Sequence, residues 1–396
     1  MKKTISILLA LLMLALCMMP AAMAEGSEEA ATAEAVAEET KVEASTEEAT
    51  VEAADETYGF EYWTPGAASL AALVAFVDDV TDENSPHFVP VEDRIAVFDM
   101  DGTLYGELAP IYVEWAMFAY RVLDDSRFTP DEEMVSVAEE VRAVTVPGNI
   151  PSGLEVRQAT QNARAYAGMT LTEFADYVNN FILKDAVGFE NMIYASAFYL
   201  PMIEVVDYLQ ENDFKVYICS GSDRFLCRVL LDGWIDVPAD QIIGMDVRLE
   251  AQGQAGADGL EYVYTPGDLI VRTGELLVKN VKANKPFQIA QEIGRQPIIS
   301  FGNSSGDTSM AMYVTHNNKY HSAAFMVVAD DTERDYGNAE KAAKLAQTWT
   351  DNGWVVISEK NDWLTIYGYD VVKTSGEETA EAACSCGCSG NCGCCK

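Results

Sequence analysis

Basic side chains are scarce in this chain. Its 396 residues include 26 Lys and Arg against 63 Asp and Glu, which gives a formal net charge of −37. Nucleic acids and anionic lipid surfaces are bound through positively charged surface, so the composition argues against both as partners. Histidine is also rare. We interpret His87, His316 and His321 as solvated or core-edge residues without a catalytic role.

Long apolar runs are missing after the first twenty residues. Ile5 to Met19 is almost wholly apolar, follows two lysines and precedes the small-residue site Ala22-Met23-Ala24. The run is too short for a permanent membrane span, so we predict a bacterial signal peptide over residues 1–24 and a secreted or cell-surface protein with no stable membrane span. A lipoprotein signal at Cys17 is the alternative, and Leu16 before that cysteine disfavours it.

Large apolar side chains are also missing from both flanks of the chain. Residues 25–57 hold eleven Glu among Ala, Thr and Val, and residues 374–396 are rich in Gly, Ser, Glu and Cys. Neither segment can bury enough surface to offset its ordering entropy. We therefore predict a disordered acidic spacer and a disordered tail, with the folded part between them.

Cysteines fall into two groups. Cys219 and Cys227 lie in a predicted strand and the helix after it, where small apolar packing is expected. The other group occupies the tail and comprises Cys384, Cys386, Cys388, Cys392, Cys394 and Cys395. Their C-x-C spacing is typical of a thiolate cluster for soft metals, and in an oxidising exterior disulfides or a disulfide-linked partner are equally expected.

The folded part alternates helix and strand patterns, except in one block. Short apolar strands are predicted at 94–98, 214–219, 242–245, 297–301, 323–328 and 354–357, with a hairpin over 247–264. Residues 105–198 instead contain helical patterns at 110–123, 131–144, 153–166 and 172–183. We predict an α/β, Rossmann-like core (58–104 and 199–373) with a parallel sheet covered by helices on both faces, and an inserted all-helical cap (105–198).

The first chemical motif follows the first strand. Asp99 and Asp101 are separated by one residue and lead into Gly102-Thr103. Active sites of open α/β sheets lie at the carboxyl ends of the strands. One carboxylate could attack phosphorus while the other handles the leaving-group proton. An ordinary Asx turn is the alternative for the motif taken alone.

Two weaker motifs follow further along the chain. Ser220 and Gly221 end the 214–219 strand, where a hydroxyl and a backbone N–H could bind a phosphate oxygen. Lys285 precedes a helix predicted over 286–293, where its charge could neutralise a phosphate and a carboxylate. Lys279 and Lys282 are near rivals for this place.

The last motif is Gly302-Asn303-Ser304-Ser305-Gly306-Asp307, after the 297–301 strand. Oxygen donors four residues apart on a loop suit Mg²⁺, which prefers oxygen ligands. A Ser/Gly turn that caps the next helix is the alternative.

In this order and spacing the motifs resemble those of the haloacid-dehalogenase superfamily, over residues 90–360. The resemblance implies an Mg²⁺-dependent phosphatase with Asp99 as nucleophile and Asp101 as general acid/base. It also implies Ser220, Gly221 and Lys285 as phosphate-binding groups, with Lys285 catalytic as well. The metal site would comprise Asp99, Asp101 (through its carbonyl), Asn303 and Asp307.

The helical insertion resembles the cap of the phosphoserine-phosphatase-like branch, which implies a small phosphorylated metabolite as substrate. The stretch Val327 to Tyr336 resembles bacterial phosphorylcholine phosphatases. Glu107, Tyr105, Tyr112 and Trp115 are candidates to hold a substrate amine through an acid and cation–π contacts. Packing of the cap helices is the alternative for the aromatic residues, and a helix N-terminal charge is the alternative for Glu107.

One departure concerns the metal site. The fourth motif of the superfamily usually begins Gly-Asp, and this chain has Gly302-Asn303, so we predict weaker Mg²⁺ binding. Two other functions stay open: a phosphomutase or phosphotransferase of the same superfamily, and a catalytically weak surface protein that acts through its Cys-rich tail.

Overall fold

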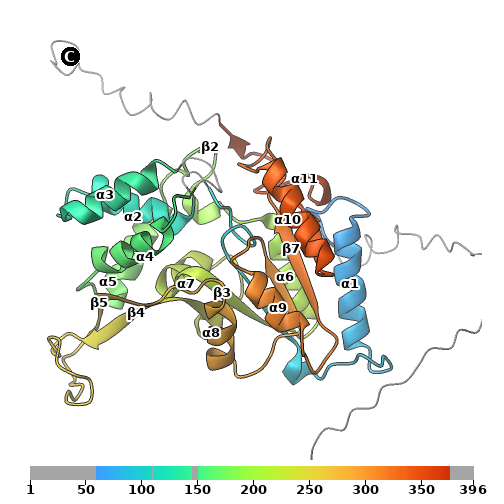
Figure 1. Cartoon of the computed structure of the whole chain (residues 1–396), viewed down its shortest axis with the longest axis horizontal. Helices are drawn as coiled ribbons and strands as arrows, with labels where there is room; N and C mark the ends of the chain where they lie inside the picture. The colour runs from blue at the N-terminus through green and yellow to red at the C-terminus, as the bar shows by residue number, and fades with distance from the viewer. Residues whose placement is uncertain (1–58, 109–110, 145–149, 375–396) are drawn as a thin grey trace, which may run out of the picture. The chain divides into compact units, whose positions relative to one another are not determined.

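A seven-stranded sheet forms the centre of the structure, a computed structural model that describes residues 59–108, 111–144 and 150–374 (Figure 1). Its strand order is β5-β4-β3-β1-β6-β7-β8, and the neighbouring strands pair in parallel except β4 with β5. The strands are β1 (Ile95–Phe98), β3 (Lys215–Asp223), β4 (Ile242–Ala251), β5 (Ile270–Val278), β6 (Ile299–Gly302), β7 (Ala323–Val328) and β8 (Val355–Ser358). A small antiparallel pair joins β2 (Phe189–Glu190) to β9 (Val372–Lys373).

Helices cover both faces of this sheet. One face is packed by α1 (Ala68–Thr81), α6 (Leu200–Glu211) and α7 (Arg224–Leu231), and the other by α8 (Asn284–Glu292), α9 (Thr308–Thr315) and α10 (Ala339–Asp351). The short α11 (Glu359–Asp362) follows β8. All four β1 residues are buried, and they alternate between the two cores, because successive strand residues point to opposite faces. Phe98 also stacks on Phe301 of β6 with ring centroids 4.1 Å apart.

The helical insertion leaves and rejoins the core at one point. It contains α2 (Val113–Leu123), α3 (Glu132–Arg142), α4 (Leu154–Ala165) and α5 (Leu171–Ile182), which lie together beside the sheet in Figure 1. The Gly106 N–H donates to Ala197 O, and the Tyr199 N–H donates to Leu104 O, each at 2.9 Å. The predicted fold class, a Rossmann-like α/β core with an inserted helical cap, is confirmed.

The prediction for residues 242–264 was wrong in detail. The strand expected over 242–245 continues to Ala251, and its hairpin partner is β5, well beyond the expected end at 264. The Gly-rich stretch forms the connection between the strands, so the hairpin is longer than the pattern indicated. The partner strand was missed because its burial is interrupted, with only Val271 and Arg272 buried in β5. β5 is therefore the edge strand of the sheet.

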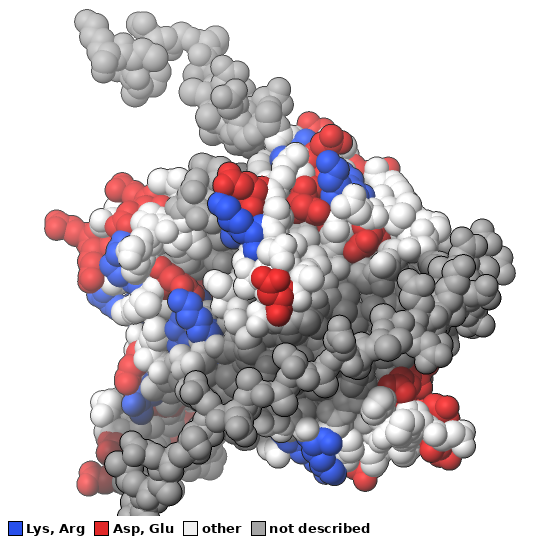
Figure 2. All heavy atoms as spheres, turned by 45° about the vertical axis from the view of Figure 1, so that its right-hand side comes forward, with Lys and Arg blue, Asp and Glu red and all other residues white. Residues whose placement is uncertain are grey.

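The flanking segments predicted at 1–24, 25–57 and 374–396, including the six tail cysteines, lie outside the described residues except for Thr374, whose N–H donates to Gly188 O at 2.9 Å. Within the described ranges no helix is long and apolar enough to cross a membrane. On the face shown in Figure 2, Lys and Arg side chains of the described part lie singly or in small groups among acidic side chains. Acidic and basic side chains are thus interspersed on this face.

Glu204 on α6 is a half-buried acid that should make stability depend on pH. Its carboxylate accepts hydrogen bonds from the Glu61 N–H at 2.7 Å and the Tyr62 N–H at 3.2 Å. Burial nevertheless raises the pKa of Glu204 to about 7. The folded state thus disfavours the charged form, so the cost is absent below pH 4.5, grows between about pH 4.5 and 7 and is constant above that.

The free energy of unfolding of Glu204→Gln should therefore exceed that of wild type by about 1 kcal/mol more at pH 8 than at pH 4.5. This value includes a reduction for solvent screening of the half-buried group. Urea unfolding of both proteins at several pH values measures this difference. A constant offset between variant and wild type across that range would contradict the assignment.

Candidate active site

The position of β1 brings three of the four motifs together. β1 lies between β3 and β6, so the loops that follow these three strands leave the same edge of the sheet side by side. Lys285 reaches this edge as the second residue of α8, inside the helix rather than before it as predicted. Its Nζ lies 2.5 Å from Asp99 Oδ1 and 2.6 Å from Asp307 Oδ1, and all three side chains are buried.

Asp307 anchors both the lysine and its own loop. While Oδ1 accepts from Lys285, Oδ2 accepts from the N–H groups of Asn303 and Ser304, at 3.2 and 3.0 Å, and from the Ser304 hydroxyl at 3.1 Å. Both oxygens are thus engaged by the protein. This arrangement suits a residue that positions Lys285 and the Asn303–Gly306 loop.

Charge is strongly coupled in this group. Burial, then the nearby Asp307, raises the pKa of Asp99, and the Lys285 ammonium opposes that shift. Burial alone would lower the pKa of Lys285, but Asp307 and Asp99 raise it above its ordinary value. The lysine is therefore a permanent cation, and the surplus carboxylate charge around it favours a further cation.

Asp101 has one free carboxylate oxygen. Oδ2 accepts from the Ser222 hydroxyl at 2.8 Å, and Oδ1 is buried without a hydrogen-bond partner. Burial raises the pKa of Asp101 to about 7, the Ser222 hydrogen bond lowers it, and Glu114 and Glu107 raise it. A carboxyl group with a pKa near neutrality can both give and take a proton, which is what general acid/base catalysis needs.

Asn303 lies against the loop that follows β1 and contains Gly102. A Cβ on Gly102, which has φ of +79°, would meet Asn303 Nδ2 at 1.8 Å, so a glycine is required there. The same Nδ2 donates to Glu107 Oε1 at 2.8 Å. This bond fixes the amide orientation, because turning it would oppose two oxygen acceptors. The amide oxygen of Asn303 is consequently directed away from Glu107.

The last four residues of β3, Ser220–Asp223, close another side of the pocket, and the pairing of β3 with β4 shifts register there. We call this strand end the phosphate loop, after the group that the sequence motif is expected to bind. Gly221 and Ser222 line the pocket together with Lys279. The Ser220 side chain is fully buried, and its hydroxyl accepts from the Ser222 N–H at 3.0 Å. In this geometry Gly221 and Ser222 are the members of the loop that face the pocket.

Two of the four predicted substrate residues line the pocket. Tyr112 and Trp115 form part of its wall with their rings 5.5 Å apart, and Glu155 at the start of α4 joins them. Tyr105 is fully buried elsewhere, with its hydroxyl donating to Tyr194 O at 2.6 Å. Glu107 reaches the site through Asn303.

The donor set of the pocket fits Mg²⁺. The described residues contain no cluster of three His, Cys, Asp or Glu side chains arranged to hold a metal. Mg²⁺ is usually bound through one or two carboxylates, with water and phosphate oxygens completing its octahedron. The Asp99 carboxylate, the Asp101 carbonyl and the Asn303 amide oxygen could hold it in this way.

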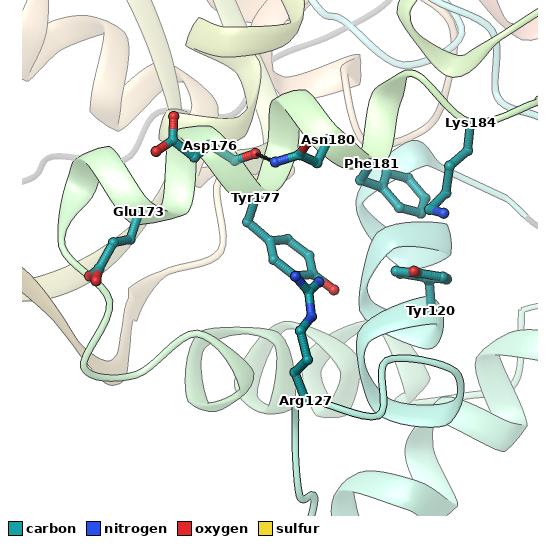
Figure 3. Close-up of a pocket in the computed structure, with 8 residues that line it drawn as sticks. All are labelled: Tyr120, Arg127, Glu173, Asp176, Tyr177, Asn180, Phe181 and Lys184. Atoms are coloured by element: carbon teal, nitrogen blue, oxygen red, sulfur yellow. Dashed lines mark hydrogen bonds between the residues drawn. The ribbon is translucent and has the colours of Figure 1, made fainter.

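A second pocket lies between α2 and α5 of the insertion (Figure 3). Two of its cationic groups already have partners within the insertion. Arg127 pairs with Asp125 through two hydrogen bonds of 2.8 and 3.0 Å, and the Lys184 ammonium lies 4.4 Å from the centroid of the Tyr120 ring. The pocket is an aromatic-walled groove, and the carboxylate chemistry lies in the other pocket.

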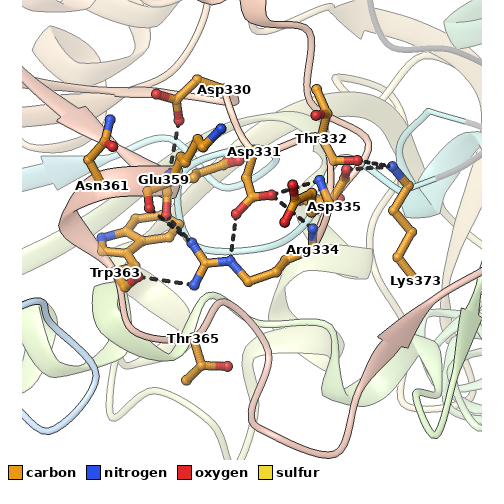
Figure 4. A network of polar contacts seen from close by, with 12 residues as sticks. Asp330, Asp331, Thr332, Arg334, Asp335, Glu359, Asn361, Trp363, Thr365 and Lys373 are labelled. Carbon is orange, nitrogen blue, oxygen red and sulfur yellow. Dashed lines mark hydrogen bonds and ion pairs between the residues drawn. The ribbon is translucent and has the colours of Figure 1, made fainter.

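The segment after β7 is held by a polar network (Figure 4). Arg334 donates to Asp331 Oδ2 at 2.5 Å and to the carbonyls of Trp363 and Glu359 at 3.0 and 2.7 Å. Lys373 donates to two further carbonyls of the segment. The stretch that resembles phosphorylcholine phosphatases therefore ties β7 to α11 and β9.

Sequence reasoning missed several residues around the pocket. Ser222, Lys279 and Glu155 line it, and Glu114 of α2 contacts the phosphate loop. Only Lys279 had a signal, as a rival of Lys285. Ser222 could have been predicted as well, because it directly follows Ser220-Gly221 at the same strand end.

Comparisons with solved structures find similar folds at low identity. A conserved protein of unknown function from Anaerococcus prevotii DSM 20548 is 13% identical, with a TM-score of 0.45 over 73% of this chain and 91% of that chain. Cytosolic 5′-nucleotidase IIIB bound to cytidine is 12% identical, with a TM-score of 0.42 over 75% and 87%.

A substrate-bound phosphoserine phosphatase is 11% identical, with a TM-score of 0.31 over 59% of this chain and 86% of that chain. No family model matches the chain, and no curated protein matches it. The function is therefore argued from the site itself.

Proposed function

We propose that this protein is a phosphatase that hydrolyses a small phosphomonoester with Mg²⁺, through an aspartyl-phosphate on Asp99. The observation that carries the proposal is the buried contact of Lys285 with both Asp99 and Asp307, with Asp101 and Asn303 in the same pocket. Lys285 and Asp99, which meet there, are 186 residues apart in the chain. Burying such a group of charges costs folding free energy, so its presence in a pocket indicates a functional site.

The reaction consists of two displacements at phosphorus. A carboxylate oxygen of Asp99 attacks phosphorus while the ester P–O bond breaks, and Asp101 gives its proton to the leaving alcohol oxygen. Asp101 then takes a proton from water, whose oxygen attacks phosphorus and frees Asp99. Lys285 and the backbone N–H groups offset charge on the transferring group, and Mg²⁺ bound here supplies the same electrostatic stabilisation.

The aromatic part of the pocket wall indicates which substrates fit the site. Tyr112 and Trp115 present aromatic rings, and Glu155 adds an acid. This combination suits an alcohol that carries an amine or quaternary ammonium, through cation–π attraction of about 0.5–2 kcal/mol. The predicted role of the aromatic pair is retained, with Glu155 as a new candidate acid beside Glu107.

A substrate panel tests the proposal. We expect phosphate release with Mg²⁺ from p-nitrophenyl phosphate, and faster release from phosphocholine or phosphoethanolamine than from sugar phosphates. Phosphate appearing on an added alcohol in place of water would favour the phosphotransferase alternative. A folded protein that is inactive on the whole panel would contradict the proposal and leave a role of the Cys-rich tail as the alternative.

Changing Asn303 to Asp is expected to tighten Mg²⁺ binding only when Glu107 is changed as well. In Asn303→Asp alone, a second carboxylate would stand about 2.8 Å from Glu107, and like charges at that distance offset the gain. In the double variant with Glu107→Gln, the amide at position 107 can donate to the new carboxylate at position 303, which replaces the wild-type bond with its direction reversed. Calorimetric titration with Mg²⁺ measures both affinities.

The double variant should bind Mg²⁺ about tenfold or more tightly than wild type, since the negative charge of Glu107 is moved to position 303, where it can contact the ion directly. Wild type should need millimolar Mg²⁺ for activity. Saturation of the wild-type enzyme at micromolar Mg²⁺, or equal affinities of the single and double variants, would contradict this account of Asn303.

A further inference from the structure

Three side chains hold the backbone of the phosphate loop. Asn280 Nδ2 donates to the carbonyl of Ser220 at 2.9 Å, and Lys279 Nζ donates to the carbonyl of Gly221 at 2.8 Å. Both donors follow β5 in the core. Because a peptide group is planar, fixing a carbonyl also fixes the direction of the next N–H. The orientation of the Gly221 N–H is therefore set from outside the loop, while the Ser222 N–H is also held within it by the Ser220 hydroxyl.

The third side chain comes from the helical insertion. Glu114, in the first turn of α2, accepts from the Asp223 N–H through Oε2 at 2.5 Å. Its Oε1 lies 3.9 Å from Lys279 Nζ and makes no hydrogen bond. Glu114 thus contacts the end of the phosphate loop and lies close to the lysine that holds its middle.

The burial of Glu114 makes this arrangement demanding. The residue is 0% exposed, and a buried carboxylate is tolerated only with partners that compensate its lost hydration. Its partners include a backbone N–H of the phosphate loop, the buried Gln158 side chain of α4 and, at longer range, the Lys279 ammonium. A smaller side chain would leave the Asp223 N–H without its acceptor, and any neutral side chain would leave Lys279 without the acid that lies 3.9 Å from it.

The side chain of Asp223 links the end of the phosphate loop to β5. Its carboxylate receives Arg272 at 2.5 and 3.3 Å, and both residues are fully buried. The Asp223 carboxylate is therefore already paired with Arg272 of the core. Its backbone N–H is the group that Glu114 accepts from. A purely structural link between insertion and core would not need to act on the loop that lines the pocket.

We propose that Glu114 is a positioning residue for phosphate binding, acting through the Asp223 N–H and Lys279 on the phosphate loop. This inference rests on the proposed function, since it assumes that the loop receives the phosphoryl group. It also makes the insertion part of the phosphate site, because α2 carries the residue that fixes the loop.

Phosphate affinity and amide exchange test the proposal together. In Glu114→Ala, inorganic phosphate measured calorimetrically with Mg²⁺ should bind about tenfold more weakly, as expected for the loss of a charge-assisted hydrogen bond. Hydrogen exchange of the phosphate-loop amides should accelerate in the same variant. Glu114→Gln keeps an acceptor for the Asp223 N–H and should fall between wild type and Glu114→Ala.

Asp125→Asn is the matched control. Asp125 is a buried acid just after the same helix, and its ion-pair and hydrogen-bond partners Arg121, Arg127 and Tyr177 all belong to the insertion. This variant should leave phosphate affinity and loop exchange unchanged. If Glu114→Ala does not fold, Lys279→Met removes the donor to Gly221 and should weaken phosphate binding in the same way.

Phosphate affinity of folded Glu114→Ala within twofold of wild type would overturn the inference, whatever the exchange rates. The proposed function fails on a different result: wild-type protein that neither binds phosphate nor releases it from any ester. The two failures are therefore distinguishable in one set of titrations.

Discussion

Lys285→Met should be among the most damaging single substitutions in this chain. It leaves Asp99 and Asp307 buried without their shared cation, and removing one partner of a buried ion pair costs about 3–5 kcal/mol. Phosphate release should also fall at least about a hundredfold, because the cation beside the nucleophile is lost. Denaturant unfolding and phosphate-release assays measure the two effects.

The loss of stability should depend on pH with a defined sign. Burial already raises the pKa of Asp99, and without Lys285 this pKa rises further. The cost of the unpaired carboxylates is present above that raised pKa and is relieved as protons bind, so the variant should recover stability relative to wild type as the pH falls. Lys282→Met, at an exposed lysine three residues away, is the control and should change neither quantity.

Asp99→Asn should abolish phosphate release while leaving the fold intact. The substitution keeps the size of the side chain and an oxygen near Lys285, but an amide oxygen is not a nucleophile that can form the phosphoryl intermediate. We expect a loss of at least about a thousandfold in turnover, on the scale seen when a catalytic nucleophile is removed. Phosphate release from p-nitrophenyl phosphate measures it.

Asp213→Asn is a suitable control for this substitution. Asp213 is exposed and has φ of +63°, a conformation that Asn adopts readily, so the same chemical change there should be silent. Activity of Asp99→Asn within tenfold of wild type would reject Asp99 as the nucleophile.

The sequence was informative where chemistry follows a short buried strand. RIAVF before Asp99 and PIISF before Gly302 predicted both the strands and the edge of the sheet at which the motifs lie, because buried parallel strands are short apolar runs. These local patterns were sufficient for the fold class and for the meeting of Asp99, Lys285 and Asp307.

Contacts between distant segments could not be predicted in this way. Ser222 meets Asp101 across 121 positions of the chain, and Glu114 meets Asp223 across 109. Nothing local distinguishes Glu114 from any other acid in the first turn of a helix. Tyr105 shows the converse, because an aromatic residue near the motif in sequence is buried away from the pocket.

The central claim is that phosphate passes through Asp99, and trapping the intermediate tests it most directly. The enzyme is mixed with substrate and Mg²⁺, quenched in acid during turnover and digested, and the peptides are weighed by mass spectrometry. The account predicts one added phosphoryl group on the peptide that contains Asp99, and none in Asp99→Asn. A phosphoryl group on another residue, or turnover with unmodified protein throughout, would contradict it.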